Sequence, residues 1–330
     1  MSESNREVEQ EVWERRLKVL ETCLGASIMR YMHDDNVTEV MVNPDGRLWL
    51  DTFDKGFQST DIIINPEDTK RIIYIIADLS GQVIDLKTDP SLQANIPESR
   101  LFANCRFQAE LPPIVTAPSF NIRKHSKIVI TLEDYVRQGA MTEHQREAIL
   151  AAIHGKKNII AAGGTGSGKT TLLNAILAEI SALDERVVTI EDTKELKCTA
   201  ENYVALSTTD TVDMDNLLRK TLRLSPNRIV VGEVRGKEAL TLVDAWSTGH
   251  RGGCSTVHSD SARDTLFRLE DLVSRVSISS QQAGIARAID VIVYIERRAV
   301  SRVIAEVLSI DGWDREAHDY ITHRLDQGKE

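Results

Sequence analysis

The spacing of apolar and polar residues along the chain predicts a series of helices and strands, beginning with a helix and a hairpin. Apolar residues recur at helical spacing from Trp13 to Leu24, and Gly25 follows at the position of a C-terminal cap. Two short runs of alternating apolar residues, 37–42 and 47–50, lie on either side of a Pro-Asp-Gly turn. This arrangement predicts a β-hairpin.

The remainder of this first region predicts one more helix and several strands. Residues 66–80 begin with a proline and two acidic residues, which is typical of a helix N-terminus. From 85 to 121 the sequence is strand-like and interrupted by prolines. Together these elements predict a small α+β N-terminal domain over residues 1–124, followed by a polar linker over residues 125–142.

After the linker the pattern becomes a regular alternation of strand and helix. Such an alternation is the mark of an α/β domain with a mostly parallel sheet, which we expect over residues 143–330. Two later apolar runs, 290–296 and 302–310, predict a hairpin. The other expected elements are helix 142–154, strand 157–162, helix 169–182, strand 186–190, helix 211–224, strand 228–232 and helix 236–248.

The bulk composition is that of a soluble globular protein. The 330 residues are 42% hydrophobic and 27% charged, and this length suits roughly two domains. No apolar run approaches the roughly 20 residues that span a bilayer. The first residues are charged throughout and lack the apolar core of a signal peptide, so we expect a cytoplasmic protein.

Charge and cysteine content argue against several functions. The formal net charge of −10 repels nucleic-acid phosphates on average, which disfavours general DNA or RNA binding. The cysteines contain no C-x-x-C pair, which argues against a zinc knuckle or a disulfide framework. We expect buried or incidental thiols at Cys23, Cys105, Cys198 and Cys254.

One glycine-rich segment matches the phosphate-binding pattern G-x-x-x-x-G-K-[ST] at every fixed position. Its glycines let backbone N–H groups turn towards phosphate oxygens at the start of the next helix. Lys169 adds a charge for the β- and γ-phosphates, and Thr170 offers a hydroxyl to Mg²⁺. A chance glycine-rich turn is the alternative, but a strand precedes the loop and a helix follows it. The expected nucleotide-binding residues are Gly163, Gly164, Thr165, Gly166, Ser167, Gly168, Lys169, Thr170 and Thr171.

Two acidic strand ends are expected to complete this site. The apolar strand 228–232 leads to Glu233, which suits a residue that orients water. Many ATPases have an aspartate before this glutamate, whereas this chain has Gly232. Because Mg²⁺ needs hard oxygen ligands, another carboxylate must replace it. Glu191 and Asp192 follow a second apolar strand and are the expected replacement.

Two histidines flank a glycine-rich, strand-like run. His250 and His258 are eight residues apart, and a neutral imidazole can donate to a phosphate oxygen or polarise water near pH 7. The same pair suits a metal site or two ordinary surface histidines. A zinc site lacks a third ligand nearby, and the residues alone leave the other possibilities open.

The order of these motifs resembles one family, the secretion-superfamily ATPases of type IV secretion and bacterial conjugation. Its phosphate loop, acidic box, G-E-V-R-G strand and histidine box correspond to Gly163–Thr170, Glu191–Glu195, Gly232–Gly236 and Gly249–His258. Further matches lie at Asn43–Gly46, Pro112-Pro113, Ser119–Lys124 and Arg223–Pro226. The resemblance extends from about residue 35 to about residue 300.

The resemblance implies a RecA-like P-loop NTPase domain with ATP and Mg²⁺ as ligands. It implies that Glu233, assisted by Glu191, acts on water or on the metal, with Thr170, Glu191 and Glu233 as the metal ligands. It implies that His250 and His258 sense the γ-phosphate. Arg106 and Arg123 of the N-terminal domain would grip phosphates, which suits the forked guanidinium.

The family also implies an assembly. We expect a homohexameric ring that hydrolyses ATP to power conjugative DNA transfer, type IV secretion or pilus assembly. Its partners would be other secretion ATPases, the coupling protein and inner-membrane channel components. Contact with the inner face of the cytoplasmic membrane would be peripheral.

Three positions depart from the family pattern. Asn227 replaces a usual aspartate, Arg251 a frequent proline and Asp260 a frequent asparagine. None of these changes removes an implied phosphate ligand.

Other functions remain as alternatives. A pilus-retraction motor, or an extension or type II secretion motor, belongs to the same superfamily, but the latter two usually carry a tetracysteine zinc insert. A nucleotide-binding scaffold without turnover is disfavoured by Lys169, Thr170 and Glu233. A helicase is disfavoured by the acidic composition and the lack of helicase-like motifs.

Overall fold

The computed structural model describes residues 3–52, 55–96, 99, 105–124, 129–209, 211–298 and 301–326, with side chains from residue 11 onward. The chain divides into two compact units, Met1–Ile128 and Val129–Glu330. The sequence predicts a linker over 125–142, of which 125–128 lie outside the described residues. The rest of that range carries a helix, Leu132–Arg137, and its Leu132 side chain is buried in the core of the second unit.

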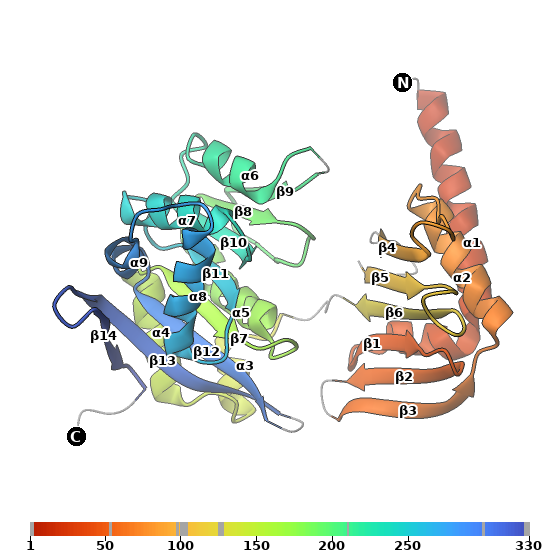
Figure 1. Cartoon of the computed structure of the whole chain (residues 1–330), viewed down its shortest axis with the longest axis horizontal. Coiled ribbons are helices and arrows are strands. Elements are labelled where there is room, and N and C mark those ends of the chain that lie inside the picture. Colours follow the sequence, from red (N-terminus) through yellow and green to blue (C-terminus); the bar gives the residue numbers. More distant parts are fainter. Residues whose placement is uncertain are drawn as a thin grey trace. The chain divides into compact units, whose positions relative to one another are not determined.

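The described part of the first unit contains a six-stranded sheet and two helices. Neighbouring strands are antiparallel in the order β3-β2-β1-β6-β5-β4 (Figure 1). Apolar residues of helices and strands, such as Ile72, Val40 and Phe107, share one core. The elements are α1 (Glu3–His33), β1 (Val37–Val42), β2 (Arg47–Thr52), β3 (Gly56–Ile63), α2 (Pro66–Leu79), β4 (Ser91–Ile96), β5 (Cys105–Glu110) and β6 (Ser119–Lys124).

The predicted hairpin and second helix of this unit are confirmed, whereas the first helix is longer than predicted. Gly25 does break the helix, with φ 68° and ψ 168°. The chain then continues in helical conformation to His33. The reason is that Ile28 and Met32 beyond the break are also apolar and are buried in the same core.

The second unit is an α/β domain, which confirms the predicted fold class. Its eight-stranded sheet has the order β14-β13-β12-β7-β11-β10-β8-β9, parallel from β12 to β9 and antiparallel from β12 to β14. The strands are β7 (Ile159–Gly163), β8 (Val187–Glu191), β9 (Tyr203–Ser207), β10 (Arg228–Val234), β11 (Cys254–His258), β12 (Val291–Arg298), β13 (Ser301–Asp314) and β14 (Asp319–Arg324).

Helices cover both faces of this sheet (Figure 1). Alternate residues of β7 show the two layers, because Ile159 belongs to one apolar core and Ile160 to the other. The first core includes α3 (Leu132–Arg137), α4 (Glu143–His154) and α5 (Lys169–Ser181). The second includes α6 (Met214–Thr221), α7 (Glu238–Ser247), α8 (Ala262–Ser274) and α9 (Gln282–Ala288).

Two buried polar side chains tie together the amino edge of this sheet, where the parallel strands begin. Arg228 at the start of β10 is 1% exposed. It pairs with Glu185 and donates to the carbonyl oxygens of Gly252 and Ile153, both at 3.0 Å. Asn158, next to β7, donates to the Ala288 carbonyl at 2.7 Å and accepts from the Gly253 N–H at 3.0 Å. Removing either side chain would leave buried polar groups without partners.

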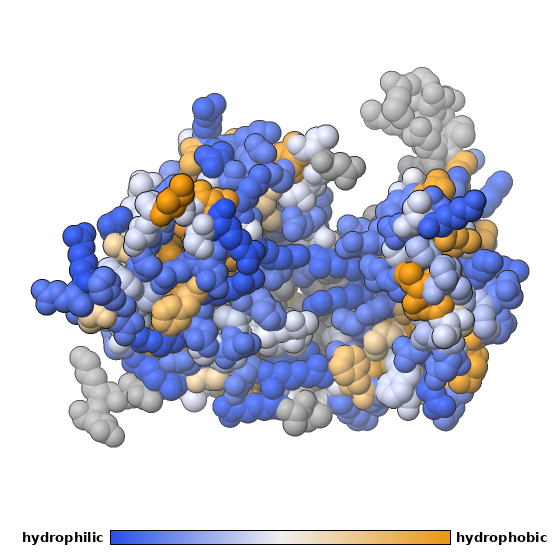
Figure 2. Space-filling view, in the orientation of Figure 1, coloured by the Kyte–Doolittle hydropathy of each residue, from blue (hydrophilic) through white to orange (hydrophobic). Residues whose placement is uncertain are grey.

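The face of the molecule in Figure 2 is largely hydrophilic, with apolar residues in small separate groups. Within the described part of the chain, every helix is too short or too polar to cross a bilayer.

Candidate functional site

The chemistry-bearing residues of the second unit gather where its parallel strands end. Parallel strands bring their carboxyl ends to one edge of the sheet. In the order β7, β11, β10 and β8, these ends carry Gly163, His258, Glu233 and Glu191. The strand pairing therefore brings together residues that are far apart in the sequence.

The glycine-rich loop joins β7 to α5 in the expected way. Gly166 and Gly168 have positive φ angles of 69° and 99°, a region that glycine occupies without strain. Gly168 is the N-cap of α5, and no side chain caps this helix end. The first N–H groups of α5 are donors without intrahelical partners, at the positive end of the helix dipole. The loop therefore offers donors and positive potential to an anion.

Close packing fixes the start of the loop. A Cβ atom at Gly163 would lie 2.2 Å from the Ile295 carbonyl oxygen and 2.5 Å from Ser167 Oγ. At Gly164, by contrast, no atom lies within 4 Å of the equivalent position. The absent side chain at Gly163 is therefore a steric requirement, whereas Gly164 faces open space.

The polar side chains of the loop fit a phosphate ligand. Lys169 at the start of α5 donates from Nζ to the Gly164 carbonyl at 2.8 Å, so its ammonium group points back over the loop. Ser167 Oγ is buried and has no hydrogen-bond partner among the described residues. Thr170 and Thr171 follow on the first turn of α5, each partly exposed, and Thr165 is exposed on the loop. A nucleotide phosphate would supply an acceptor for the Ser167 hydroxyl.

Glu191 is a buried carboxylate at the end of β8, with 5% of its surface exposed. Burial raises the pKa of this carboxyl from 4.5 to about 7. Hydrogen bonds to its Oε1 from the N–H groups of Glu195 (2.8 Å) and Leu196 (2.7 Å) act in the opposite direction. A carboxyl whose pKa lies near neutral pH is typical of functional sites.

Gly232 explains how Glu191 fits beside β10. A Cβ atom at Gly232 would lie 3.2 Å from Glu191 Cγ and 3.7 Å from Glu191 Oε1. The Glu191 side chain therefore occupies the space where a residue-232 side chain would project. The two positions predicted to compensate for one another lie in contact.

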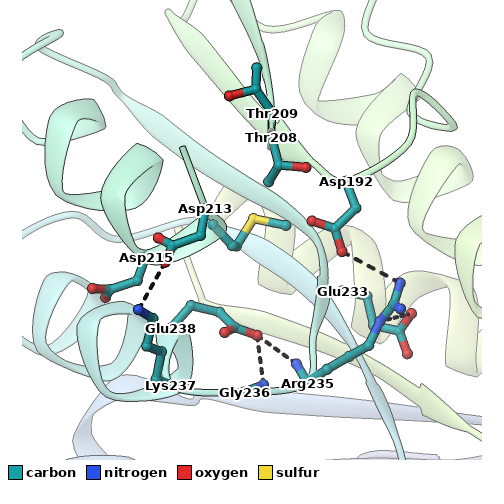
Figure 3. A pocket seen from close by; sticks show the side chains of 11 residues that line it. Asp192, Thr208, Thr209, Asp213, Asp215, Glu233, Arg235, Gly236, Lys237 and Glu238 are labelled. Carbon is teal, nitrogen blue, oxygen red and sulfur yellow. Dashed lines mark hydrogen bonds and ion pairs between the residues drawn. The ribbon is translucent and has the colours of Figure 1, made fainter. Parts of the chain in front are cut away.

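Glu233 borders a cavity of about 380 Å³ (Figure 3). Its Oε2 forms an ion pair with Arg235 Nε at 2.9 Å, and Arg235 Nη2 lies 3.8 Å from Asp192 Oδ2. Glu238 accepts from the N–H groups of Arg235 and Gly236 at 2.7 and 2.8 Å. The cavity also has Thr208, Thr209, Asp213, Met214, Asp215, Gly236, Lys237 and Glu238 in its lining.

The structure places the two histidines at opposite edges of the sheet, and their predicted role at the γ-phosphate stays a prediction. His258 ends β11 and lies level with Gly163 of the neighbouring β7, with its side chain exposed. His250 precedes β11, and its N–H donates to the Ala245 carbonyl at the end of α7. It lies at the amino edge, before a strand whose first and last Cα atoms are roughly 13 Å apart at about 3.3 Å per residue. The reason is topological, because β11 runs parallel to β7 between the two histidines.

Arg106 and Arg123 belong to the first unit, where they lie directly opposite one another on β5 and β6. Arg123 Nε also lies 3.6 Å from Glu39 Oε1 on β1. The structure thus brings the two arginines together. Their phosphate contacts, implied by the family resemblance, stay a prediction.

Comparison with known proteins decides the family. Residues 24–311 match the family model described as "Type II/IV secretion system protein". The chain belongs to this family.

Individual relatives agree with this assignment. The "Conjugal transfer protein TrbB" of Rhizobium radiobacter is 44% identical over 302 residues, covering 91% of each chain. The "Probable conjugal transfer protein TrbB" of Sinorhizobium fredii is 39% identical over 318 residues, covering 96% of each chain. The resemblance to conjugal-transfer ATPases such as TrbB is confirmed.

The fold agrees as well. The crystal structure of the Legionella pneumophila ATPase DotB matches with a TM-score of 0.64 at 19% identity, covering 93% of this chain and 82% of that chain. At this identity the match concerns the fold alone. It supports an N-terminal domain followed by a RecA-like domain.

Two of the three departures from the family pattern, Asn227 and Arg251, have structural partners at the amino edge of the sheet, whereas Asp260 is exposed just after the carboxyl end of β11. Asn227 Oδ1 accepts from the Arg186 N–H at 2.8 Å. Arg251 Nη1 donates to both carboxylate oxygens of Asp290 at 3.0 Å. Both residues therefore lie away from the phosphate loop, in agreement with the expectation that they remove no phosphate ligand.

Sequence reasoning missed one contact with the phosphate loop of this secretion-family domain. Arg302 on β13 donates from Nε to the Gly166 carbonyl at 3.3 Å. The sequence predicts the hairpin that carries it, but no motif marks the arginine. Only the strand order, with β12 beside β7, shows that the hairpin lies beside the loop.

Replacing Gly163 by alanine is expected to destabilise the protein by about 1–3 kcal/mol, because the new methyl group overlaps the Ile295 carbonyl. Gly164→Ala is the matched control on the adjacent residue and is expected to change the free energy of unfolding by less than about 1 kcal/mol. Urea unfolding of both variants measures the difference. Equal stability of the two variants would contradict the packing argument.

The stability of the metal-free protein is expected to fall as pH rises from about 5 to about 7. The pKa of Glu191 is higher in the folded state than in the unfolded chain, so folding favours its protonated form. This contribution, on the order of 3 kcal/mol, is present below the unfolded pKa and is lost as pH rises through the folded value. Urea unfolding in a chelator at several pH values measures it. In Glu191→Gln the free energy of unfolding should no longer fall between about pH 5 and about pH 7. Glu201→Gln, at an exposed position, should behave as the wild type does. The same pH dependence in all three proteins would refute the assignment of this effect to Glu191.

Proposed function

We propose that this chain is an ATP hydrolase that powers conjugative transfer, type IV secretion or pilus assembly. The observation that carries the proposal is the assembly of the phosphate loop, His258, Glu233 and Glu191 at one edge of one sheet. The similarity to proteins named for conjugal transfer supports the choice of process.

The residues of the chain suit specific steps. The loop N–H groups and Lys169 bind and orient the β- and γ-phosphates. Glu233 orients the attacking water. His258, exposed beside Gly163, donates to the γ-phosphate in its protonated or neutral form.

A magnesium ion fits the donor set. Thr170, Glu191 and Glu233 would hold it, because hydroxyl and carboxylate oxygens are the ligands that Mg²⁺ prefers. When bound, Mg²⁺ supplies charge neutralisation across the β- and γ-phosphates. Among the described residues no cluster of three His, Cys, Asp or Glu side chains forms a metal site by itself.

In this proposal, Glu233 leaves its ion pair with Arg235 when nucleotide binds. Its carboxylate pairs with Arg235, which also approaches Asp192. An ion pair half exposed to solvent is weak, so a bound nucleotide can reorganise it at little cost. Arg235 thereby holds the carboxylate in place until water and phosphate arrive.

The proposal extends to the assembly. Membership of the secretion family supports a homohexameric ring whose partners are other secretion ATPases, the coupling protein and channel components. It also supports peripheral association with the inner face of the cytoplasmic membrane.

Lys169→Ala is expected to abolish nucleotide binding, since it removes the charge that the phosphates need. Glu233→Gln should retain binding and lower turnover by at least about 100-fold, because the amide no longer orients water as a carboxylate does. Steady-state phosphate release with Mg²⁺ and ATP measures turnover, and calorimetry measures binding. Matched controls are the exposed Lys220→Ala and Glu201→Gln. Wild-type protein that binds ATP without hydrolysing it would favour the scaffold alternative and overturn the enzyme.

Light scattering of the wild-type protein with Mg²⁺ and a non-hydrolysable ATP analogue is expected to give a mass about six times that of the monomer. Nucleotide stabilises the ring only if it binds the assembled form more tightly. A persistent monomer at high protein concentration would contradict the ring.

A further inference from the structure

The β12–β13 hairpin extends beyond the end of the neighbouring strand β7. The parallel register pairs Tyr294 with Ala162, which places Ile295 level with Gly163 at the end of β7. Strand β12 continues to Arg298. At about 3.3 Å per residue, Arg297 lies roughly 7 Å past the end of β7. The hairpin therefore stands beside the phosphate loop.

The loop is shaped to receive this hairpin. A Cβ atom at Gly168 would lie 3.0 Å from Arg302 Cδ, and one at Gly166 would lie 3.8 Å from Arg297 Nη1. Arg302 Nε donates to the Gly166 carbonyl at 3.3 Å. Both arginine side chains therefore lie beside the phosphate loop.

The two arginines occupy directly opposite positions on the hairpin, and both are partly buried. Like charges at opposite positions destabilise a strand pair. An anionic or planar ligand between the loop and the hairpin would contact both guanidinium groups favourably. Guanidinium groups bind phosphate in a fork and stack on planar rings, which makes both parts of a nucleotide suitable ligands.

The strand order gives the nucleotide a direction. His258, Glu233 and Glu191 lie on β11, β10 and β8, on one side of the loop, whereas the hairpin lies on the other. If the acidic residues act at the γ-phosphate, the phosphate chain points away from the hairpin. The hairpin side then faces the opposite end of the molecule.

We propose that Arg297 and Arg302 bind the nucleoside and α-phosphate of the nucleotide held by the loop. This inference rests on the proposed ATP binding and names the residues that hold the far end of the ligand. The nucleoside end is common to ATP, ADP and the transition state. The two arginines therefore lower the KM for ATP and the Kd for ADP and leave kcat unchanged.

The test compares Arg297→Gln and Arg302→Gln with Arg298→Gln in the full-length protein. Arg298 is an exposed residue of the same hairpin that pairs with Glu296. Calorimetry with ADP and with pyrophosphate measures binding, and steady-state ATP hydrolysis gives KM and kcat. We expect the Kd for ADP and the KM for ATP to rise about tenfold in the first two variants, with kcat within about twofold of wild type. The Kd for pyrophosphate and all values for Arg298→Gln should stay within about twofold.

Other outcomes overturn the inference. An unchanged ADP affinity in both variants, or a loss of kcat alone, places the arginines away from the nucleoside end. A parallel loss of pyrophosphate affinity shows that they only brace the loop. These failures differ from failure of the proposed function, in which the wild-type protein itself binds neither ADP nor ATP, or Lys169→Ala binds both as wild type does. Thermal unfolding of each variant separates loss of folding from loss of binding.

Discussion

The site depends on the parallel pairing of β7, β11, β10 and β8, with a register shift between Val231 and Val234 of β10. Each strand contributes one residue at or next to its carboxyl end, and none of these residues is near another in the sequence. Register within each pair is fixed by the buried apolar residues of both cores, such as Ile159 and Ile160 on β7, because a shift of one residue would exchange the two faces. The precision of the site is therefore derived from the packing of the sheet.

The two edges of the sheet have different roles. At the amino edge, Arg228 and Asn158 bind carbonyl and N–H groups from several connections, and these buried bonds are costly to break. At the carboxyl edge, Glu233 forms an ion pair that is partly exposed to water, and Lys169 donates to the Gly164 carbonyl. The bonds at the amino edge are therefore more costly to rearrange than the partly exposed ion pair at the carboxyl edge.

Much of this architecture could be predicted from sequence because local signals agree with the fold. The strand–loop–helix around Lys169 has strong periodicity and a motif with a physical requirement for glycine. The separation of His250 from His258 could not be predicted, since spacing does not reveal which edge a residue reaches. Strand β9 and helix α9 lack strong signals, because β9 is short and half-exposed and α9 has seven residues. The loop contact of Arg302 depends on strand order, which no local pattern encodes.

The hydrogen bond from Lys169 to the Gly164 carbonyl has a consequence for ligand choice. The ammonium group already has an acceptor inside the loop, at 2.8 Å. An incoming molecule must offer a better one, and a charged oxygen surpasses a carbonyl dipole whereas a hydroxyl or an amide does not. The loop is therefore expected to bind negatively charged ligands in preference to uncharged ones.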